Sequence, residues 1–430
     1  MQLKELSSTI TVVNSIIGVS VLTLPFCYQQ CGVVLGSLLL LSCSWMAYRS
    51  SMMLIDAALS ANRKTYFGLA QVSFGVPGKI FIEISMIGLL LGTCIAFFAA
   101  LEDLVASLFM KLTGSSILPW QHALLLCTIT SISVLPLSLQ KMVSNSAWQS
   151  LTTIIFYILL MFVLVVSCLR SALSGGLSWD EVHLWHWSGV TKCLPILATS
   201  FCGHPLVLPI YFNFRGQSVE QMNRAFKYAN IIVVTFYAMI GLSGYLAYTG
   251  SVPGDILAAL PPSLVTDGIR IIFLVSLTSS FPLIILPCRQ AINTLLFEQQ
   301  KEDGTFSVSG DMPFHRHVTC TVMIVFCTMI MGVLVPDVQT VLAVMGSTMA
   351  SVICFISPSA IYEKLRGGTL RGRVIFGMGV TLLLIRASSI SNLTAMEFLQ
   401  QPMRKSIVPI EKINVHLANT TSGHPYNTGY

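Results

Sequence analysis

Two stretches of this 430-residue chain, NSIIGVSVLTLPF at residues 14 to 26 and SFCGHPLVLPIY at residues 200 to 211, place glycine and proline inside long apolar runs. Glycine weakens a helix because it leaves the backbone unrestricted, and proline cannot donate the hydrogen bond that a helix interior needs. Both runs are otherwise apolar enough to form helices. The sequence therefore predicts two interrupted helices, one in each half of the chain.

The composition is that of a polytopic, all-α membrane protein. Hydrophobic residues make up 54% of the chain, charged residues only 10%, and the mean hydropathy is +0.76. A soluble domain would carry about 25% charged residues. Eleven apolar runs approach the length of about 20 residues that spans a bilayer, and the last is the weakest because Arg386 interrupts it. They lie at 7–26, 32–55, 80–101, 121–139, 148–169, 190–211, 228–249, 269–288, 318–336, 338–361 and 374–390.

The distribution of basic residues predicts a cytoplasmic N-terminus, because short cytoplasmic loops carry an excess of lysine and arginine. With this orientation the inside segments hold sixteen basic residues and the outside loops hold four. The net charge of +6 is therefore interpreted as membrane topology, and no nucleic-acid partner is predicted. The four outside residues are Lys111, Arg170, Lys192 and Arg270.

The C-terminal end of the chain differs from the rest. Residues 1–392 are predicted to form the membrane domain, and residues 393–430 are polar, without a periodic apolar face, and are predicted to be disordered. Eleven spans would place this tail outside, where two sequons at Asn392 and Asn419 could be glycosylated. The choice between the plasma membrane and an internal membrane stays open.

The twelve cysteines fall mostly within or beside the apolar runs. Their spacing is typical of neither a disulfide scaffold nor a metal cluster. Cys27 and Cys31 are further apart than a CxxC pair, and no second pair complements them. Cysteine is a small polarisable residue, so the spacing predicts helix-packing positions.

The two interrupted runs also suggest an internal repeat. Gly18 precedes Leu24-Pro25 at nearly the spacing by which Gly203 precedes Leu208-Pro209. Five spans separate the two elements, and an odd offset reverses the direction through the membrane. The prediction is a pair of inverted repeats, at about 7–170 and 190–362, with an additional helix at about 374–390.

Interrupted helices have a known chemical use inside membranes. The second half of a broken helix begins with free N–H groups and the positive end of its dipole, which can hold a carboxylate, while carbonyls freed at the end of the first half can coordinate a cation. Such a pair favours a secondary transporter, with the substrate near the midplane. The alternative is that both are proline-kinked packing helices, which membrane proteins also use.

Several segments resemble the sodium-coupled neutral amino acid transporters of the amino acid/auxin permease superfamily, and in particular the divergent branch numbered ten. The resemblance runs from about residue 9 to residue 362. It implies a fold similar to the bacterial leucine transporter, with a five-plus-five inverted repeat and an eleventh helix. The segments are the first span with Asn14 before Gly18, SMIGLLLGTCIAF (85–97), SVLPLSLQ (133–140), HPLVLPIY (204–211) and TSSFPLIILPCR (278–289).

The resemblance also implies site residues. Asn14 would contribute an oxygen to a sodium site, with a hydroxyl from Thr278 as first choice and Ser280 as second; oxygen ligands suit a hard cation. Gly18, Val19 and Ser20 would bind the substrate carboxylate, although the family's unwound turn usually reads Gly-Ser-Gly. The facing break adds Cys202, Gly203 and His204 to the expected substrate site.

Each of these residues also has a structural interpretation. Asn14 could bond a neighbouring helix through its amide. Thr278 and Ser280 could bond the carbonyl one turn back in their own helix. His204 could satisfy a backbone group freed by Pro205, or could titrate and make transport pH-sensitive. The sequence leaves these alternatives open.

The prediction from the sequence is a secondary transporter of small, neutral amino acids such as glutamine or alanine. It would bind sodium as coupling ion, need no other cofactor, and work by alternating access. The alternatives are an amino acid sensor, and a proton-coupled or uncoupled exchanger on the same fold. An enzyme is not predicted, because no phosphate loop, nucleophile elbow or histidine pair on one helical face is present.

Overall fold

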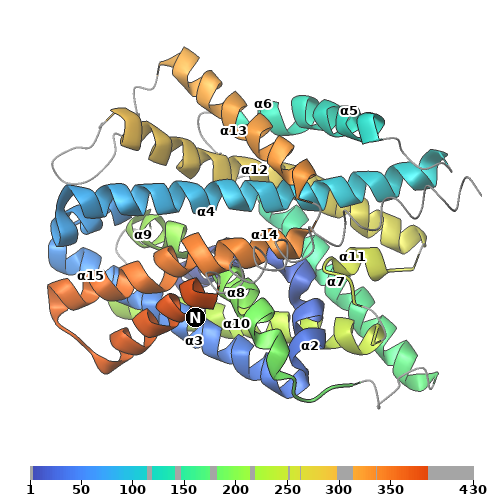
Figure 1. Cartoon of the computed structure of the whole chain (residues 1–430), viewed down its shortest axis with the longest axis horizontal. Coiled ribbons are helices and arrows are strands. Elements are labelled where there is room, and N and C mark those ends of the chain that lie inside the picture. Colours follow the sequence, from blue (N-terminus) through green and yellow to red (C-terminus); the bar gives the residue numbers. More distant parts are fainter. Residues whose placement is uncertain are drawn as a thin grey trace, which may run out of the picture. The chain divides into compact units, whose positions relative to one another are not determined.

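The described residues are mostly helical, with no strand among them (Figure 1). The described residues up to Leu383 belong to one compact unit. A computed structural model describes residues 3–113, 119–140, 147–174, 182–213, 218–249, 252–261, 263–297, 313–335 and 337–385.

The first predicted interruption is present. Helix α1 (Leu3–Ile16) ends before Gly18, and the chain continues as a 3₁₀ turn, η1 (Val19–Thr23), that leads into α2 (Leu24–Cys31). The second half of this span is bent by 59° relative to the first. Gly18 is extended, with φ −139° and ψ −161°, and Pro25 stands in the first turn of α2, where its missing N–H removes no helical bond. The sharp bend therefore lies between Ile16 and Val19.

The second predicted interruption is also present, with a shallower bend. Helix α8 (Val190–Ser200) ends before Phe201, and α9 (His204–Asn213) begins after Gly203. Pro205 occupies the first turn of α9, and the residue before a proline disfavours helical geometry. The helices α8 and α9 together still form one membrane span, from Trp187 to Phe212.

The remaining helices follow the other predicted runs. Within α4 the backbone leaves helical geometry at Gly75 (φ 70°), two residues before Pro77, so the predicted span begins after this kink. Three segments are π-helical: η2 (Thr130–Val134), η5 (Gly346–Ala350) and η6 (Val352–Ile356). The other elements are α3 (Val33–Ala61), α4 (Tyr66–Thr113), α5 (Pro119–Ile129), α6 (Leu135–Ser138), α7 (Ala147–Leu173), η4 (Trp187–Gly189), α10 (Val219–Ala247), α11 (Ile256–Ala259), α12 (Leu264–Phe297), α13 (Phe314–Leu334), α14 (Val338–Met345), α15 (Ser357–Arg366) and a helix at 370–385.

The protein is a multi-pass integral membrane protein. Among the described residues, eight helices are long and apolar enough to cross a membrane, or nine if the bent pair at Ser7–Ile16 and Val19–Cys31 counts as one span. The predicted run at 121–139 contains a shorter apolar helix, Ala123–Ser138. Of the predicted eleventh span, the described part forms a helix to residue 385; Arg386 and the predicted disordered tail lie outside the described residues.

Exposed apolar side chains show which helices face lipid. On α7, Ile158, Phe162 and Leu169 are each more than half exposed. Only 22% of the most apolar window of this helix is buried, against 67% for α4. Because lipid is as apolar as these side chains, such a surface is stable only in a membrane. Helix α7 therefore lies at the periphery of the bundle and α4 lies inside it.

The interior helices pack closely. Helix α4 contacts α12 and α13 (Figure 1), and Phe98 meets Phe281 of α12 with ring centroids 4.6 Å apart. Helix α10 contacts α1, α2 and α7, while α8 contacts α14 and η5. Small residues allow these approaches, because Gly241 of α10 faces Tyr28 and Gly346 of η5 faces the Pro195 carbonyl.

The contact between η5 and α8 gives the first prediction. A Cβ atom at Gly346 would overlap the backbone carbonyl of Pro195 and approach the Thr199 hydroxyl. Because a helical carbonyl cannot move aside, we expect Gly346→Ala to lower the free energy of unfolding by about 1 to 3 kcal/mol. The measurement is thermal unfolding of the purified protein in detergent.

Gly268→Ala in α12 is the matched control. A Cβ at Gly268 would meet nothing within 4 Å, so this change should leave stability unchanged or raise it by up to about 1 kcal/mol. Equal unfolding temperatures for the two variants would contradict the close packing of α8 on η5.

Candidate functional site

The two interruptions meet at one cavity. This cavity measures about 180 Å³, which is room for a small organic solute rather than for one or two waters. Its wall includes both breaks and side chains from α4, α7 and α12. A Cβ added to Gly203 would lie 3.1 Å from the Ile16 side chain and 3.5 Å from Ser15 Oγ. The second break therefore packs directly against the end of α1.

Most of the predicted site residues lie in the cavity wall, but two do not. Those in the wall are Asn14, Gly18, Val19, Ser20, Cys202, Gly203 and Ser280. His204 and Thr278 are not among the lining residues. Their assignments to substrate and sodium stay predictions, and the structure places both side chains elsewhere.

The first break presents the start of a helix to the cavity. Val21 N–H donates to Gly18 O at 3.2 Å, which closes the first 3₁₀ turn. The earliest N–H groups of a helix have no partner within it, and here they belong to Val19 and Ser20, which line the cavity. A Cβ at Gly18 would meet nothing within 4 Å, so the backbone is openly accessible at this point. The positive end of the half-helix therefore faces the cavity.

A tyrosine joins the carbonyl ends of both breaks. The Tyr237 hydroxyl of α10 lies 3.0 Å from Ser200 O, at the end of α8, and 3.3 Å from Ile16 O, at the end of α1. The side chain is fully buried. Each carbonyl would otherwise end a helix inside the membrane without a partner. Tyr237 was not predicted from the sequence, and its only signal there is a polar aromatic residue within an apolar run.

The predicted sodium ligands divide into two groups. Asn14 and Ser280 line the cavity, and Ser280 Oγ also donates to Ser276 O at 2.8 Å. The Thr278 hydroxyl is buried against the Leu274 and Val275 carbonyls, at 2.9 and 3.0 Å. Both hydroxyls therefore make the bond to their own helix that the sequence left open as the alternative. Of the two hydroxyls, Ser280 is the one placed to reach an ion in the cavity.

His204 does not line the cavity and instead contacts α3. It is only 1% exposed, and its Nε2 is 3.1 Å from Ser50 Oγ and 3.3 Å from Ser51 Oγ of α3. Its partners are thus side-chain hydroxyls rather than the backbone group freed by Pro205. One of its ring nitrogens also lies near the sulfurs of Cys202 and Cys354, a set of groups able to hold a metal ion.

Comparison with known proteins identifies the family. The sequence pattern of the family described as transmembrane amino acid transporter protein matches residues 1–394. The chain belongs to this family. A family of transporters is not a class of enzymes, in agreement with the prediction from the sequence.

The relatives confirm the resemblance stated from the sequence. The chain is 43% identical over 387 residues to human solute carrier family 38 member 10, covering 90% of this chain and 34% of that protein. It is 22% identical over 380 residues to sodium-coupled neutral amino acid symporter 2 of Danio rerio, covering 82% of this chain and 73% of the relative. The chain thus spans about a third of the length of the first relative.

Solved structures confirm the predicted fold class. Mhp1, a transporter of the nucleobase-cation-symport-1 family, matches with a TM-score of 0.52 at 11% identity, covering 92% of each chain. A manganese transporter of Eremococcus coleocola matches with a TM-score of 0.52 at 14% identity, covering 96% of this chain and 91% of that one. At such identities the match shows the fold alone, which is the leucine-transporter type.

The position of Tyr237 gives the second prediction. Tyr237→Phe leaves a freed carbonyl at a break without its donor, and we expect it to lower the free energy of unfolding by about 1 to 3 kcal/mol. Thermal unfolding in detergent measures the effect. Tyr48→Phe makes the same chemical change at an exposed hydroxyl bonded to Asn223, where water replaces the lost bond, so its effect should stay within about 0.5 kcal/mol. If Tyr237→Phe is as stable as the unsubstituted protein, the Tyr237 hydroxyl does not hold the two breaks together.

Proposed function

We propose that this chain is a sodium-coupled symporter that moves small neutral amino acids across the membrane by alternating access. The observation that carries the proposal is the meeting of two broken helices at one cavity. Membranes tolerate non-helical backbone only where protein covers it or where it lines a cavity. In secondary transporters such breaks form the substrate and ion sites between the repeats.

The first break supplies a place for the carboxylate of an amino acid. The half-helix from Val19 to Cys31 begins at the cavity wall. Its first N–H groups and its dipole attract an anion, and the open space at Gly18 allows a ligand to approach the backbone closely. The carbonyl end of α1 at Ile16, which also lines the cavity, suits the positive amino group.

The remaining wall favours a neutral side chain. None of the described residues that line the cavity is Asp, Glu, Lys, Arg or His. Apolar contacts come from Leu89, Phe97 and Phe273. A charged substrate side chain would enter this wall without a partner, at a cost of several kcal/mol. Alanine- and glutamine-like amino acids fit the wall because their side chains carry no charge.

Sodium is the coupling ion that the polar groups favour. Asn14 and Ser280 offer an amide and a hydroxyl oxygen beside the carbonyls of the first break, and hard cations prefer oxygen ligands. The described wall holds no carboxylate or histidine to carry a proton in its place. The zebrafish relative is named as a sodium-coupled symporter of neutral amino acids, and the same coupling is proposed for this chain.

Uptake of labelled neutral amino acids into proteoliposomes tests the proposal. We expect accumulation with an inward sodium gradient and none with choline in place of sodium. Uptake that is indifferent to sodium would instead make the chain a proton-coupled or uncoupled exchanger. Saturable binding without uptake would make it a sensor.

The third prediction concerns Asn14. Removing one oxygen ligand of a cation costs about 1.5 to 3 kcal/mol, so Asn14→Ala should raise the sodium concentration for half-maximal uptake by about ten- to a hundredfold. Thr11→Ala is the matched control, because its exposed hydroxyl bonds only the Ser7 carbonyl one turn back in the same helix. An unchanged sodium dependence in Asn14→Ala would exclude Asn14 from the site.

The fourth prediction concerns Gly18. Valine adopts the extended backbone found here, and its Cβ meets nothing within 4 Å, so Gly18→Val should fold normally. Its methyl groups would project into the cavity and should weaken substrate binding by at least about tenfold, or 1.4 kcal/mol.

Equilibrium binding of a labelled substrate, with thermal unfolding in parallel, separates the two effects of Gly18→Val. Gly268→Val is the control, since that glycine also faces open space but lies outside the cavity wall. Wild-type affinity in a folded Gly18→Val protein would show that the substrate does not approach the first break.

A further inference from the structure

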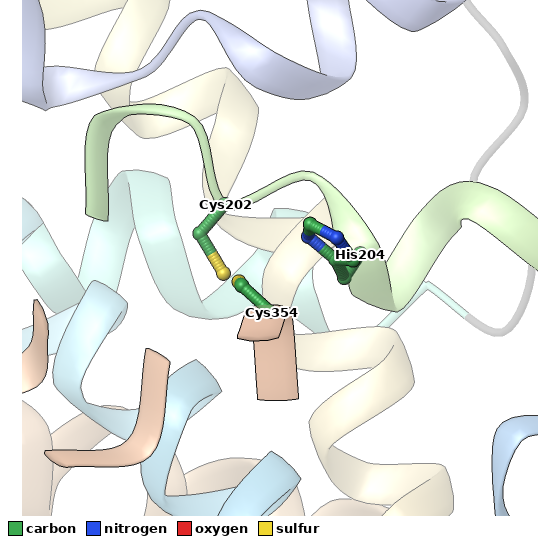
Figure 2. Close-up of side chains that lie close together, drawn as sticks. All are labelled: Cys202, His204 and Cys354. Atoms are coloured by element: carbon green, nitrogen blue, oxygen red, sulfur yellow. The ribbon is translucent and has the colours of Figure 1, made fainter. Parts of the chain in front are cut away.

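Three groups with affinity for soft metal ions meet beside the second break. Cys202 lies in the break between α8 and α9, His204 is the first residue of α9, and Cys354 lies in the π-helical segment η6. Their ligand atoms all lie within 4.8 Å of one another. Figure 2 shows the two sulfur atoms facing each other with the imidazole ring beside them. His204 and Cys354 are each 1% exposed, while Cys202 is half-buried and lines the cavity.

The hydrogen bonds around His204 determine which ring nitrogen carries its proton. The Ser50 hydroxyl donates to the Cys354 carbonyl, and the Ser51 hydroxyl donates to the Ala47 carbonyl. Each hydroxyl has a single proton, and with these protons directed to the two carbonyls both hydroxyls accept from Nε2 of His204. Nε2 therefore carries the hydrogen, and Nδ1 keeps its lone pair.

That lone pair has no partner. Nδ1 of His204 is buried and makes no hydrogen bond. A buried acceptor without a donor costs about 1 to 3 kcal/mol, so it calls for an explanation. A histidine that binds a metal through one nitrogen commonly donates its other N–H to a neighbouring oxygen. Ser50 and Ser51 supply those oxygens here.

We propose that Cys202, His204 and Cys354 bind a zinc ion. A tetrahedral zinc bonds sulfur at about 2.3 Å and nitrogen at about 2.0 Å, which places its ligand atoms about 3.5 to 3.8 Å apart. Small side-chain rotations bring the three atoms from within 4.8 Å of one another to that separation. The fourth position remains open for water from the cavity, which Cys202 lines and through which the ion can enter.

Charge also favours zinc at this depth. Binding replaces the two thiol protons, which pass to water in the cavity. The two thiolates then balance the two positive charges of the ion, so the occupied site is neutral and avoids the cost of a buried net charge. Thiolate and imidazole select zinc over sodium, magnesium or calcium, which prefer oxygen. The site is thus distinct in chemistry from the oxygen-lined sodium site proposed at Asn14 and Ser280.

An occupied site would join two segments that transport has to move. It links the second break to η6, and alternating access requires broken helices to shift against their neighbours. A π-helical segment is a common place for such adjustment. We therefore expect micromolar zinc to slow uptake, a consequence that rests on the proposed transport function, whereas zinc binding itself does not.

The first experiment measures metal binding by the purified, reduced protein. Cobalt, a spectroscopic substitute for zinc, should bind at one ion per chain and give the visible bands of a tetrahedral site with sulfur ligands, and zinc should displace it. Cys202→Ser, Cys354→Ser and His204→Ala should each abolish these bands. Ser50→Ala, which removes an acceptor of the Nε2 proton, should weaken binding by about ten- to a hundredfold.

Cys193→Ser is the matched control, because Cys193 is a buried cysteine of α8 with its sulfur 3.5 Å from the Cys27 carbonyl. This variant should keep the bands. The proposal is overturned if the unsubstituted chain binds no cobalt, or if its bands survive in the three ligand variants.

A second measurement needs no substitution and so does not depend on the folding of any variant. Zinc should protect Cys202 from alkylation by a maleimide, as read by peptide mass spectrometry, while Cys168, a half-buried cysteine near the end of α7, should react equally with and without zinc. Unchanged alkylation of Cys202 would overturn the site. Because neither measurement involves uptake, failure of the zinc site and failure of the transport function are distinguishable.

Discussion

The absence of water from the bilayer interior is the constraint on which the rest of the structure depends. Every backbone N–H and C=O in that region needs a partner within the protein, so an unbroken helix is the ordinary solution. This chain departs from it at Gly18 and again around Cys202 and Gly203. At each break, carbonyls at the end of one helix and N–H groups at the start of the next have no partner within their own helix. The single hydroxyl proton of Tyr237 is shared between the carbonyl ends of both breaks, and the cavity receives the N–H side of the first.

Much of the fold follows from the sequence, because hydropathy and proline placement act locally. The apolar runs predict where the helices lie, and Gly18 and Pro205 predict the two breaks. The bend angles do not follow in the same way. The first span bends by 59°, while the second passes as one span, since its geometry depends on how tightly α8 is held by α14 and η5. The π-helical segments η5 and η6 likewise carry no sequence signal, because their extra residue per turn is a response to packing.

In the candidate site, too, some residues could be predicted from the local sequence and others depend on tertiary packing. Asn14 and Gly18 were predicted to lie at the site and do line the cavity, because a break exposes its own neighbouring residues. Ser280 was also predicted and lines the cavity from α12. Thr278 is only two positions from Ser280, yet on a helix two positions turn a side chain to a different face. Tyr237 and Cys354 were not predicted, since what brings them to the breaks is tertiary packing between segments far apart in the chain.

The two ion sites proposed for this chain differ in chemistry, although both lie at the breaks. On the cavity side the groups offered are amide, hydroxyl and carbonyl oxygens, which suit a hard, weakly bound ion that enters and leaves in each cycle. At the proposed zinc site, thiolates and an oriented imidazole suit a borderline-soft ion held much longer. Cys202 belongs to both surfaces, because its position in the break places it in the cavity wall and within reach of His204. A zinc ion held at this residue would therefore act on the movement of the break without competing for the oxygen ligands proposed for sodium.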